Sequence, residues 1–145
     1  MDNHDPLNNN QITENIWIGN NMCCMVHSKE LMALGFDADI DLEEDRPEEP
    51  PHTKIYLWLP TTDHTPPSQD QLRTGVATIT ELVKRNLKIY VHCQNGHGRA
   101  PTLVAAYLTT QGKSVDEAVE YIKLKRPPIH LQASQVEALR EFAKS

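Results

Sequence analysis

Short apolar runs alternate with longer amphipathic segments along the first two thirds of the chain. In residues 11–20, Ile16 and Ile18 alternate with Trp17 and a Gly-Asn pair follows, which predicts a strand that ends in a turn. The same reasoning predicts strands in FDADIDL and KIYLWLP. LKIYVH is short and apolar, as an interior strand of a parallel sheet would be.

Helical periodicity fills the spaces between these runs and dominates the last third. Ser68 and Gln71 form a capping box that opens a helix, and Ser114 and Glu117 form a second one. We predict a short helix within 27–36 with Gly35 just past its end, and helices over 99–111 and 114–125. A helix that begins at Ser68 carries an apolar stripe of Leu72, Val76, Ile79 and Val83. A last helix follows Pro127-Pro128 and carries Val136, Leu139 and Phe142.

This order of elements predicts an α/β domain. We expect a central, mostly parallel sheet of four to five strands flanked by helices on both faces. Residues 1–10 are polar and lack apolar periodicity, so we predict a disordered N-terminal lead. Residues 11–145 are then a single domain, a size that can bury an adequate core.

Composition narrows the choice of partners. Apolar residues make up 39% and charged residues 23%, and the formal net charge is −6. An acidic chain argues against nucleic acid or an anionic membrane as the main partner. The N-terminus has no apolar signal core, and the three cysteines, two of them adjacent, make a poor disulfide framework. We therefore expect a cytoplasmic, reducing setting in which a free thiol persists.

Acidic residues are concentrated in one stretch. Eight of the thirteen residues from Asp37 to Glu49 are acidic. The pattern favours a solvated face and loop, with an electrostatic filter or docking surface as the alternative.

The segment IYVHCQNGHGRAPTLVAAYL, residues 89–108, carries the chemistry. A strand, a glycine-rich turn and a helix start together build an anion site, because backbone N–H groups and the helix dipole converge on the ligand. Gly96 and Gly98 permit positive φ angles and a close backbone approach. Cys93 ends the strand, and Arg99 opens the helix with a planar fork that can hold two phosphate oxygens.

The same loop predicts the role of Cys93. A helix N-terminus or a neighbouring cation lowers the pKa of a cysteine thiol from about 8.5 to roughly 3.5–7.5. A thiolate beside a bound phosphoryl group is a nucleophile, so these residue types predict phosphoryl transfer through a cysteine. A metal site made of His92, Cys93 and His97 is not expected, since adjacent strand residues face opposite ways. No cofactor is predicted.

The segment VHCQNGHGRAPT resembles the H-C-x5-R signature of cysteine-dependent protein phosphatases, most closely the small dual-specificity type. The resemblance runs from IWIGN through RPPIHL and is specific around this loop and Asp63. It implies a dual-specificity phosphatase-like fold, with Cys93 as nucleophile and Arg99 as phosphate clamp. It also implies a general acid/base at Asp63 in LPTTDHTPPS, and His92 as the residue that orders the loop. The phosphate-binding loop would comprise Gln94, Asn95, Gly96, His97, Gly98 and Arg99.

Ala100 departs from the family pattern. Members usually have serine or threonine directly after the arginine, and that hydroxyl donates to the cysteine sulfur when the intermediate is hydrolysed. Ala100 has no donor, so we expect slow hydrolysis of the cysteinyl-phosphate. Thr102 is the nearby hydroxyl that would have to compensate.

Other polar residues near the motif have open roles. His64 is a second candidate for proton transfer, and His97 is either a pH-sensitive charge near the phosphate or a solvent-facing loop residue. Asn20 or Asn21 either braces the loop or forms a turn. Gln132 and Gln135 follow RPPIHL, and Cys24 is either a resolving thiol for Cys93 or a buried structural residue.

The predicted function is hydrolysis of phosphoserine, phosphothreonine or phosphotyrosine by a monomeric enzyme, through a pocket shallow enough for all three. The partner is then a phosphorylated protein or a small phosphomonoester. The alternatives are a pseudophosphatase that binds a phosphorylated partner, or a phosphatase of a phosphoinositide, a nucleotide or an RNA end. A loop without lysine counts against the lipid. Rhodanese-type and arsenate-reductase chemistry would not need Asp63.

Overall fold

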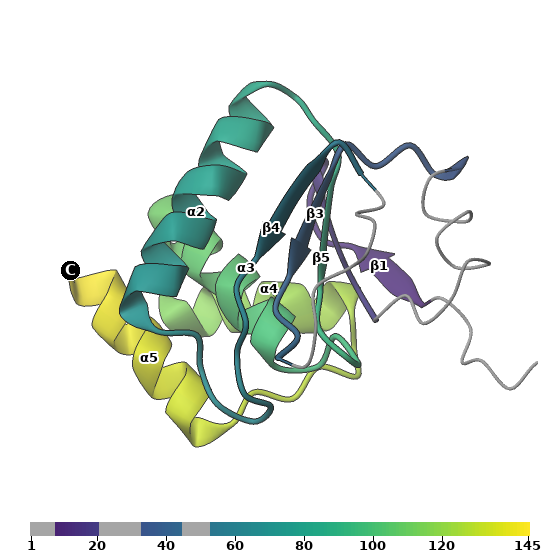
Figure 1. The fold of residues 1–145 in the computed structure, drawn as a ribbon. Helices are drawn as coiled ribbons and strands as arrows, with labels where there is room; N and C mark the ends of the chain where they lie inside the picture. The colour runs from purple at the N-terminus through teal and green to yellow at the C-terminus, as the bar shows by residue number, and fades with distance from the viewer. Residues whose placement is uncertain (1–7, 21–32, 45–52) are drawn as a thin grey trace, which may run out of the picture.

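The computed structural model describes residues 8–20, 33–44 and 53–145, and Figure 1 shows them as a sheet with helices packed against it. The strands are β1 (Asn9–Gln11), β2 (Ile16–Gly19), β3 (Ala38–Asp41), β4 (Ile55–Trp58) and β5 (Ile89–His92). They form one five-stranded sheet in the order β1-β2-β5-β3-β4. The three pairings among β2, β5, β3 and β4 are parallel, and β1 pairs with β2 in the antiparallel direction. The prediction of a mostly parallel sheet is confirmed.

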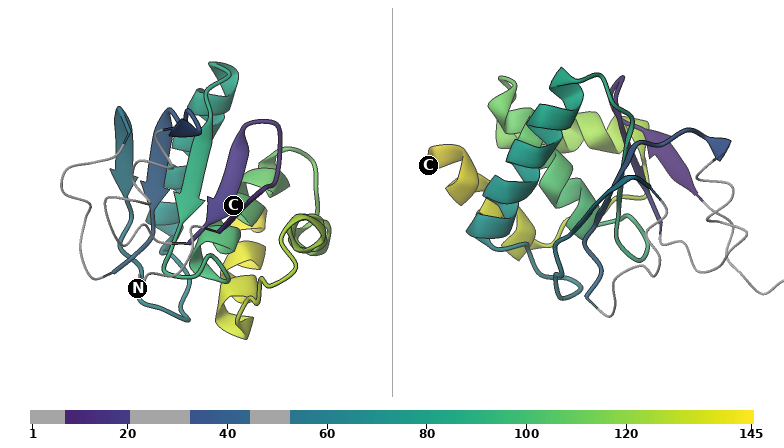
Figure 2. Two further views of the ribbon diagram at one scale, coloured as in Figure 1. Left: turned by 90° about the vertical axis from the view of Figure 1, so that its right-hand side faces the viewer. Right: turned by 45° about the horizontal axis from the view of Figure 1, so that its top comes forward.

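The described helices are α2 (Gln69–Lys84), α3 (Arg99–Thr110), α4 (Val115–Lys125) and α5 (Ala133–Lys144). All four lie on the same side of the sheet (Figures 1 and 2). The expectation of helices on both faces is therefore not met by the part of the chain that the structure describes. The helix predicted over 27–36 falls largely on residues 21–32, which lie outside the described ranges.

The two capping boxes begin their helices as the sequence predicts. The Ser68 hydroxyl accepts from the Gln71 N–H while the Gln71 side chain accepts from the Ser68 N–H. Ser114 and Glu117 make the same pair of bonds. Each box provides side-chain oxygen acceptors for two backbone N–H groups at the start of its helix, which would otherwise lack partners within the helix.

The alternation of strand residues divides the sheet into two faces. Ile18, Val91, Ile40 and Leu57 lie side by side across β2, β5, β3 and β4 and face the helices. The helix-side core adds Leu103 and Val104 of α3, both fully buried. The opposite face carries aromatic and charged residues instead, with Trp17 and Tyr90 packed around Phe36.

The acidic stretch is not simply a solvated surface. Asp39 and Asp41 are both 0% exposed, on the face of β3 that points away from the helices. Alternation with apolar residues predicts that these positions face solvent, whereas all four residues of β3 are buried, so both faces of the strand are covered. Residues 45–52 of the same stretch lie outside the described part of the chain.

The N-terminal lead also differs from its prediction. The sequence predicts a disordered segment that includes Asn9 and Asn10, yet these are the first two residues of β1. Backbone pairing with Gly19 and Ile18 needs no apolar side chain, so the hydropathy pattern carries no signal of it. Residues 1–7 lie outside the described part.

The contact between α2 and α3 yields a prediction about packing. A Cβ added to Gly75 would lie 2.6 Å from Leu103 Cδ1 and 3.1 Å from Leu59 Cδ1. We expect Gly75→Ala to lower the free energy of unfolding by about 1–2 kcal/mol, because overpacking outweighs a gain in helix propensity of about 1 kcal/mol. Urea denaturation measures this.

A second substitution supplies the control. Leu103→Ala alone should cost about 2–5 kcal/mol, and Gly75→Ala added to it should no longer be destabilising, since the obstructing methyl group is gone. Simple additivity of the two changes would contradict the proposed contact.

Candidate active site

The phosphate-loop segment connects the end of β5 to the start of α3. β5 ends at His92 and α3 begins at Arg99 with Gly98 as its N-cap, so residues 93–98 form the loop. Gly96 has a φ of +70°, and a Cβ there would lie 2.6 Å from the Gly19 carbonyl oxygen. The predicted need for glycine is confirmed at this position by both conformation and space.

Gly98 has a different reason to be glycine. Its φ is −133°, so the prediction of a positive φ is wrong there. A Cβ on Gly98 would lie 3.1 Å from the side-chain amide of Gln135. Close approach of α5, and not backbone conformation, is the constraint at this position.

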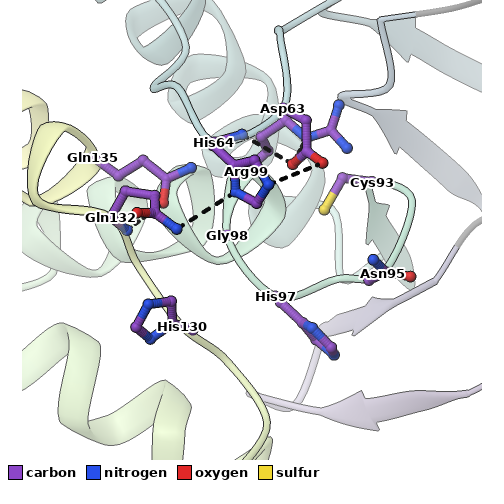
Figure 3. A pocket seen from close by; sticks show the side chains of 10 residues that line it. All are labelled: Asp63, His64, Cys93, Asn95, His97, Gly98, Arg99, His130, Gln132 and Gln135. Carbon is purple, nitrogen blue, oxygen red and sulfur yellow. Dashed lines mark hydrogen bonds and ion pairs between the residues drawn. The ribbon is translucent and has the colours of Figure 1, made fainter.

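The loop opens on a cavity of about 130 Å³ (Figure 3). Cys93 is only 2% exposed, and its sulfur lies among the side chains that line this cavity. The lining residues come from three separate segments of the chain: Asp63, His64, Cys93, Asn95, His97, Gly98, Arg99, His130, Gln132 and Gln135. The cavity therefore brings together the nucleophile, arginine and acid that the sequence predicts.

Arg99 is held by backbone carbonyls beneath the cavity. It is 4% exposed, and its Nη1 donates to the Thr61 carbonyl at 2.9 Å and to the Leu42 carbonyl at 3.4 Å. Its Nε lies 3.6 Å from Asp63 Oδ1. The guanidinium is thus fixed on one edge and faces a carboxylate on the other, where an incoming phosphate would compete for it.

Asp63 lies on the loop between β4 and α2. Its side chain is 53% exposed, and its Oδ1 accepts from the His64 N–H at 2.9 Å. His64 adopts a φ of +64°, which is uncommon for a residue other than glycine. This conformation accompanies a ring contact at 3.6 Å between His64 Nε2 and Asp63 Oδ2.

The start of α5 supports the same loop. Gln135 is 1% exposed, and its Nε2 donates to the Thr65 carbonyl at 3.1 Å. Gln132 Nε2 lies 3.4 Å from His64 Nδ1 (Figure 3). Both glutamines, whose roles the sequence leaves open, line the cavity and link α5 to the Asp63 loop.

Arg126 is a site residue that the sequence analysis missed. It is 0% exposed, its Nε donates to the Gly96 carbonyl at 2.9 Å, and its Nη2 donates to the Asn95 carbonyl at 2.9 Å. Nη1 donates to Asn10 Oδ1 at 2.8 Å. Burial lowers the pKa of Arg126, and the nearby Tyr90 and Cys93 act in the opposite direction. The available signal was an arginine directly before Pro127-Pro128 at a helix end, which also occurs in ordinary C-terminal turns.

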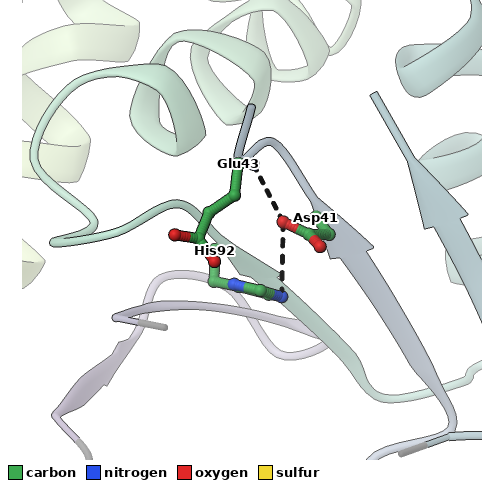
Figure 4. Close-up of side chains that lie close together, drawn as sticks. All are labelled: Asp41, Glu43 and His92. Atoms are coloured by element: carbon green, nitrogen blue, oxygen red, sulfur yellow. Dashed lines mark hydrogen bonds and ion pairs between the residues drawn. The ribbon is translucent and has the colours of Figure 1, made fainter. Parts of the chain in front are cut away.

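His92 lies on the other face of the sheet from Cys93. It is 0% exposed, and its Nε2 lies 2.8 Å from Asp39 Oδ1 and 3.9 Å from Asp41 Oδ1. Figure 4 shows Asp41, Glu43 and His92 together at the carboxyl ends of β3 and β5. His92 and Cys93 therefore do not converge on one site, as the alternation of strand residues predicts.

His97 is half-buried rather than solvent-facing. It lines the cavity, and its carbonyl accepts from the His130 N–H at 2.7 Å. Burial, and to a lesser extent the positive charge of Arg126, lowers the pKa of His97. The imidazole is thus neutral at neutral pH and offers the cavity a hydrogen bond without a charge.

Ala100 is fully buried at the start of α3. The hydroxyl of Thr102 donates to the Gly98 carbonyl at 2.7 Å, so it is occupied by its own helix and does not replace the missing donor.

Asn20 accepts from the Asn8 N–H through its Oδ1, and its carbonyl accepts from the Tyr90 hydroxyl. Asn21, Cys23 and Cys24 lie outside the described residues.

A family model matches most of the chain. Residues 16–145 match the model of the dual specificity phosphatase catalytic domain. No helix within the described ranges has both the length and the apolar character needed to cross a membrane.

Similar curated proteins include one from human and one from a virus. The human phosphatidylglycerophosphatase and protein-tyrosine phosphatase 1 is 40% identical over 90 residues, which cover 61% of this chain and 45% of that protein. The putative tyrosine phosphatase 123R of Invertebrate iridescent virus 6 is 27% identical over 136 residues, 92% of this chain and 91% of that protein. The matched part spans less than half the length of the human, rat and mouse relatives.

Similar solved structures confirm the fold. Tk-PTP in its active form has 30% identity and a TM-score of 0.83, with 94% of this chain and 96% of that chain covered. PTPMT1 in complex with PI(5)P has 26% identity and a TM-score of 0.82, with 92% and 93% covered.

The contacts of Arg126 predict a defect in anion binding. Arg126→Lys replaces the three donor nitrogens of the guanidinium with a single ammonium group. Buried carbonyls of the loop then lack partners, and each unpaired carbonyl costs about 1–3 kcal/mol of stability. We expect a lower melting temperature and at least about tenfold weaker binding of tungstate by isothermal titration calorimetry.

Arg73→Lys is the matched control. Arg73 is exposed, and its ion pair within the described residues is a 3.9 Å contact with Asp70 on the same helix, so neither quantity should change. Unchanged tungstate affinity in a folded Arg126→Lys protein would show that the loop does not depend on this side chain.

Proposed function

The chain belongs to the dual specificity phosphatase family, and we propose that it hydrolyses phosphomonoesters through a cysteinyl-phosphate intermediate. The observation that carries this proposal is the meeting of Cys93, Arg99 and Asp63 in one cavity. Binding alone would need neither a buried sulfur aimed at the anion position nor a carboxylate opposite it. This combination favours catalysis over the pseudophosphatase alternative.

The first step transfers the phosphoryl group to sulfur. The Cys93 thiolate attacks phosphorus, the bond from phosphorus to the ester oxygen breaks, and Asp63 gives its proton to the leaving oxygen. Arg99 and the loop N–H groups stabilise the charge on the three other phosphoryl oxygens, since they are fixed before the substrate arrives.

Substrate binding would change the partner of Asp63. In the structure the Asp63 carboxylate faces Arg99 Nε at 3.6 Å. A phosphate dianion that takes this edge of the guanidinium frees the carboxylate and places negative charge beside it. A neighbouring negative charge favours the protonated carboxyl group, which is the form that a general acid needs.

The second step hydrolyses the intermediate. Asp63, now ionised, takes a proton from water as the water oxygen attacks phosphorus and the bond to sulfur breaks. The leaving thiolate has no hydroxyl donor at position 100, because Ala100 is apolar and Thr102 donates to Gly98. We therefore propose that the second step limits turnover.

Apart from Asp63 and Arg99, the cavity is lined by the Cys93 thiol, neutral polar side chains, imidazoles and a glycine. A small opening of this kind admits a phosphorylated serine, threonine or tyrosine, which is the substrate class that we propose. A phospholipid monoester is the second candidate. It is favoured by the name of the human relative, a phosphatidylglycerophosphatase, and by the PI(5)P complex of a structural neighbour.

A substrate panel separates these two candidates. Release of phosphate would be compared for phosphopeptides of each hydroxyl amino acid and for short-chain, water-soluble phosphatidylglycerophosphate and PI(5)P. A kcat/KM at least about tenfold higher for one class assigns the substrate.

The two-step mechanism predicts the behaviour of two variants. Cys93→Ser should abolish hydrolysis of p-nitrophenyl phosphate, because an alcohol is not ionised at neutral pH. Asp63→Asn should lower kcat by about 10²–10⁴-fold for an alkyl phosphate, and less for p-nitrophenyl phosphate, whose leaving group needs little protonation. Steady-state rates across pH give both comparisons.

Asp70→Asn is the control, since Asp70 is an exposed residue in the first turn of α2. A folded native protein that binds tungstate and releases no phosphate from any substrate would replace catalysis with the binding-only alternative.

Ala100 predicts the shape of the time course. Native protein should show a rapid burst of p-nitrophenol near one equivalent, then a slow steady rate, in stopped-flow measurements. Ala100→Ser should remove the burst and raise kcat, by up to about a hundredfold if the hydroxyl supplies about 2.7 kcal/mol to the leaving thiolate. A native time course without a burst contradicts rate-limiting hydrolysis.

A further inference from the structure

Two ionisable side chains are completely buried side by side behind the phosphate loop. Asp39 of β3 and His92 of β5 are each 0% exposed, and Asp39 Oδ1 lies 2.8 Å from His92 Nε2. His92 is the residue directly before Cys93. The contact lies on the face of the sheet opposite the cavity, so Asp39 cannot touch a substrate bound to Cys93.

A buried carboxylate is costly unless a positive or donating group faces it. Among the described residues, His92 is the basic side chain within ion-pair distance of the Asp39 carboxyl group. The two atoms are close but not aligned as a hydrogen bond, so the contact stabilises Asp39 mainly through charge. This arrangement favours the imidazolium form of His92.

The fold alone does not require an acid at position 39. The residue shares its face of the sheet with Tyr90 of the neighbouring strand, and the second core cluster there joins Tyr90 to Phe36. An apolar side chain would fit this surrounding without the cost of a buried charge. The position is therefore explained better by what the carboxylate does to His92 than by packing.

We propose that Asp39 is a positioning residue for the nucleophile, and that its carboxylate holds His92 as an imidazolium whose charge stabilises the Cys93 thiolate. His92 is joined directly to Cys93 along the chain, whereas Asp39 is on the neighbouring strand and pairs with Tyr90, so the imidazolium is the charge that we expect to act on the sulfur. This inference rests on the proposed function only in taking Cys93 as the nucleophile.

Other charged and titratable groups surround His92. Asp41 Oδ1 is 3.9 Å from Nε2, Glu43 lies beside it at the end of β3, and the Tyr90 ring centroid is 5.5 Å from the imidazole. Asp41 is committed elsewhere, since it accepts from the Glu43 N–H at 2.8 Å and from the Tyr56 hydroxyl at 2.7 Å. Asp39 is thus 2.8 Å from the His92 ring, and Asp41 is 3.9 Å from it on the same strand.

The test measures the reactivity of Cys93 itself. Native and Asp39→Asn proteins are treated with iodoacetamide between pH 4.5 and 9, and alkylation is followed by mass spectrometry of the tryptic peptide 89–99, in which Cys93 is the one cysteine. We expect Asp39→Asn to move the midpoint of the rate profile to higher pH, with alkylation about three- to tenfold slower below it.

The direction of the change is decisive. Removing a negative charge that acted on Cys93 directly would move the midpoint to lower pH, so a downward shift or no shift in the folded variant overturns the proposal. Asp41→Asn is the matched control and should shift the midpoint less. Asp39→Asn added to His92→Asn should produce no further shift, because the carboxylate acts through the imidazole.

A second measurement needs no variant and covers the case in which Asp39→Asn does not fold. Nitrogen-15 NMR of the native protein at pH 7.5 should show protons on both ring nitrogens of His92. A neutral ring would overturn the proposal. Because neither readout depends on turnover, a failed proposal for Asp39 remains distinguishable from a failed proposal of phosphatase activity.

Discussion

The hydrogen bonds from Arg126 to the phosphate loop are the interaction on which the site depends. A loop that turns its N–H groups toward an anion must turn its carbonyls the other way, and buried carbonyls need donors. The guanidinium supplies them to Asn95 and Gly96 and also reaches Asn10 of the edge strand. One buried side chain therefore ties the end of α4 and β1 to the loop that holds Cys93. The Gly19 carbonyl packs against Gly96 so closely that the loop has no room for a Cβ at position 96.

The sheet separates two kinds of environment on either side of the nucleophile. Apolar residues of β2, β5, β3 and β4 meet the helices on one face, and this core fixes the start of α3 beneath the cavity. The other face buries Asp39, Asp41 and His92 among aromatic side chains. Because neighbouring residues of a strand point to opposite faces, His92 and Cys93 belong to different environments although they are adjacent. Charge on the far face can act on the sulfur while remaining out of reach of substrate and solvent.

The acid loop is placed by contacts that come from distant parts of the chain. Thr61 fixes the guanidinium of Arg99 through its carbonyl, while Gln135 of α5 holds Thr65. Asp63 between them remains about half exposed and faces Arg99. The loop is therefore anchored at both sides of the carboxylate, and the carboxylate itself is free to exchange its partner when a phosphate binds. This division between fixed backbone and exchangeable side chain suits a group that must both donate and accept a proton.

The sequence by itself determined the parallel strands, the capped helices, the glycine at position 96 and the placement of Cys93 and Arg99 at the two ends of one loop, whereas Asp63 was indicated only by the resemblance to the phosphatase signature. These features depend on local patterns: alternation, capping boxes, and a motif in which strand, loop and helix are continuous. The tertiary structure alone decided that Arg126 braces the loop, that Gly98 is needed for α5, and that Asp39 is buried against His92. Each of these depends on which distant segments meet. Alternation in β3 indicates only that two faces differ, and it takes the neighbouring strands to decide that the acidic face is enclosed rather than wet.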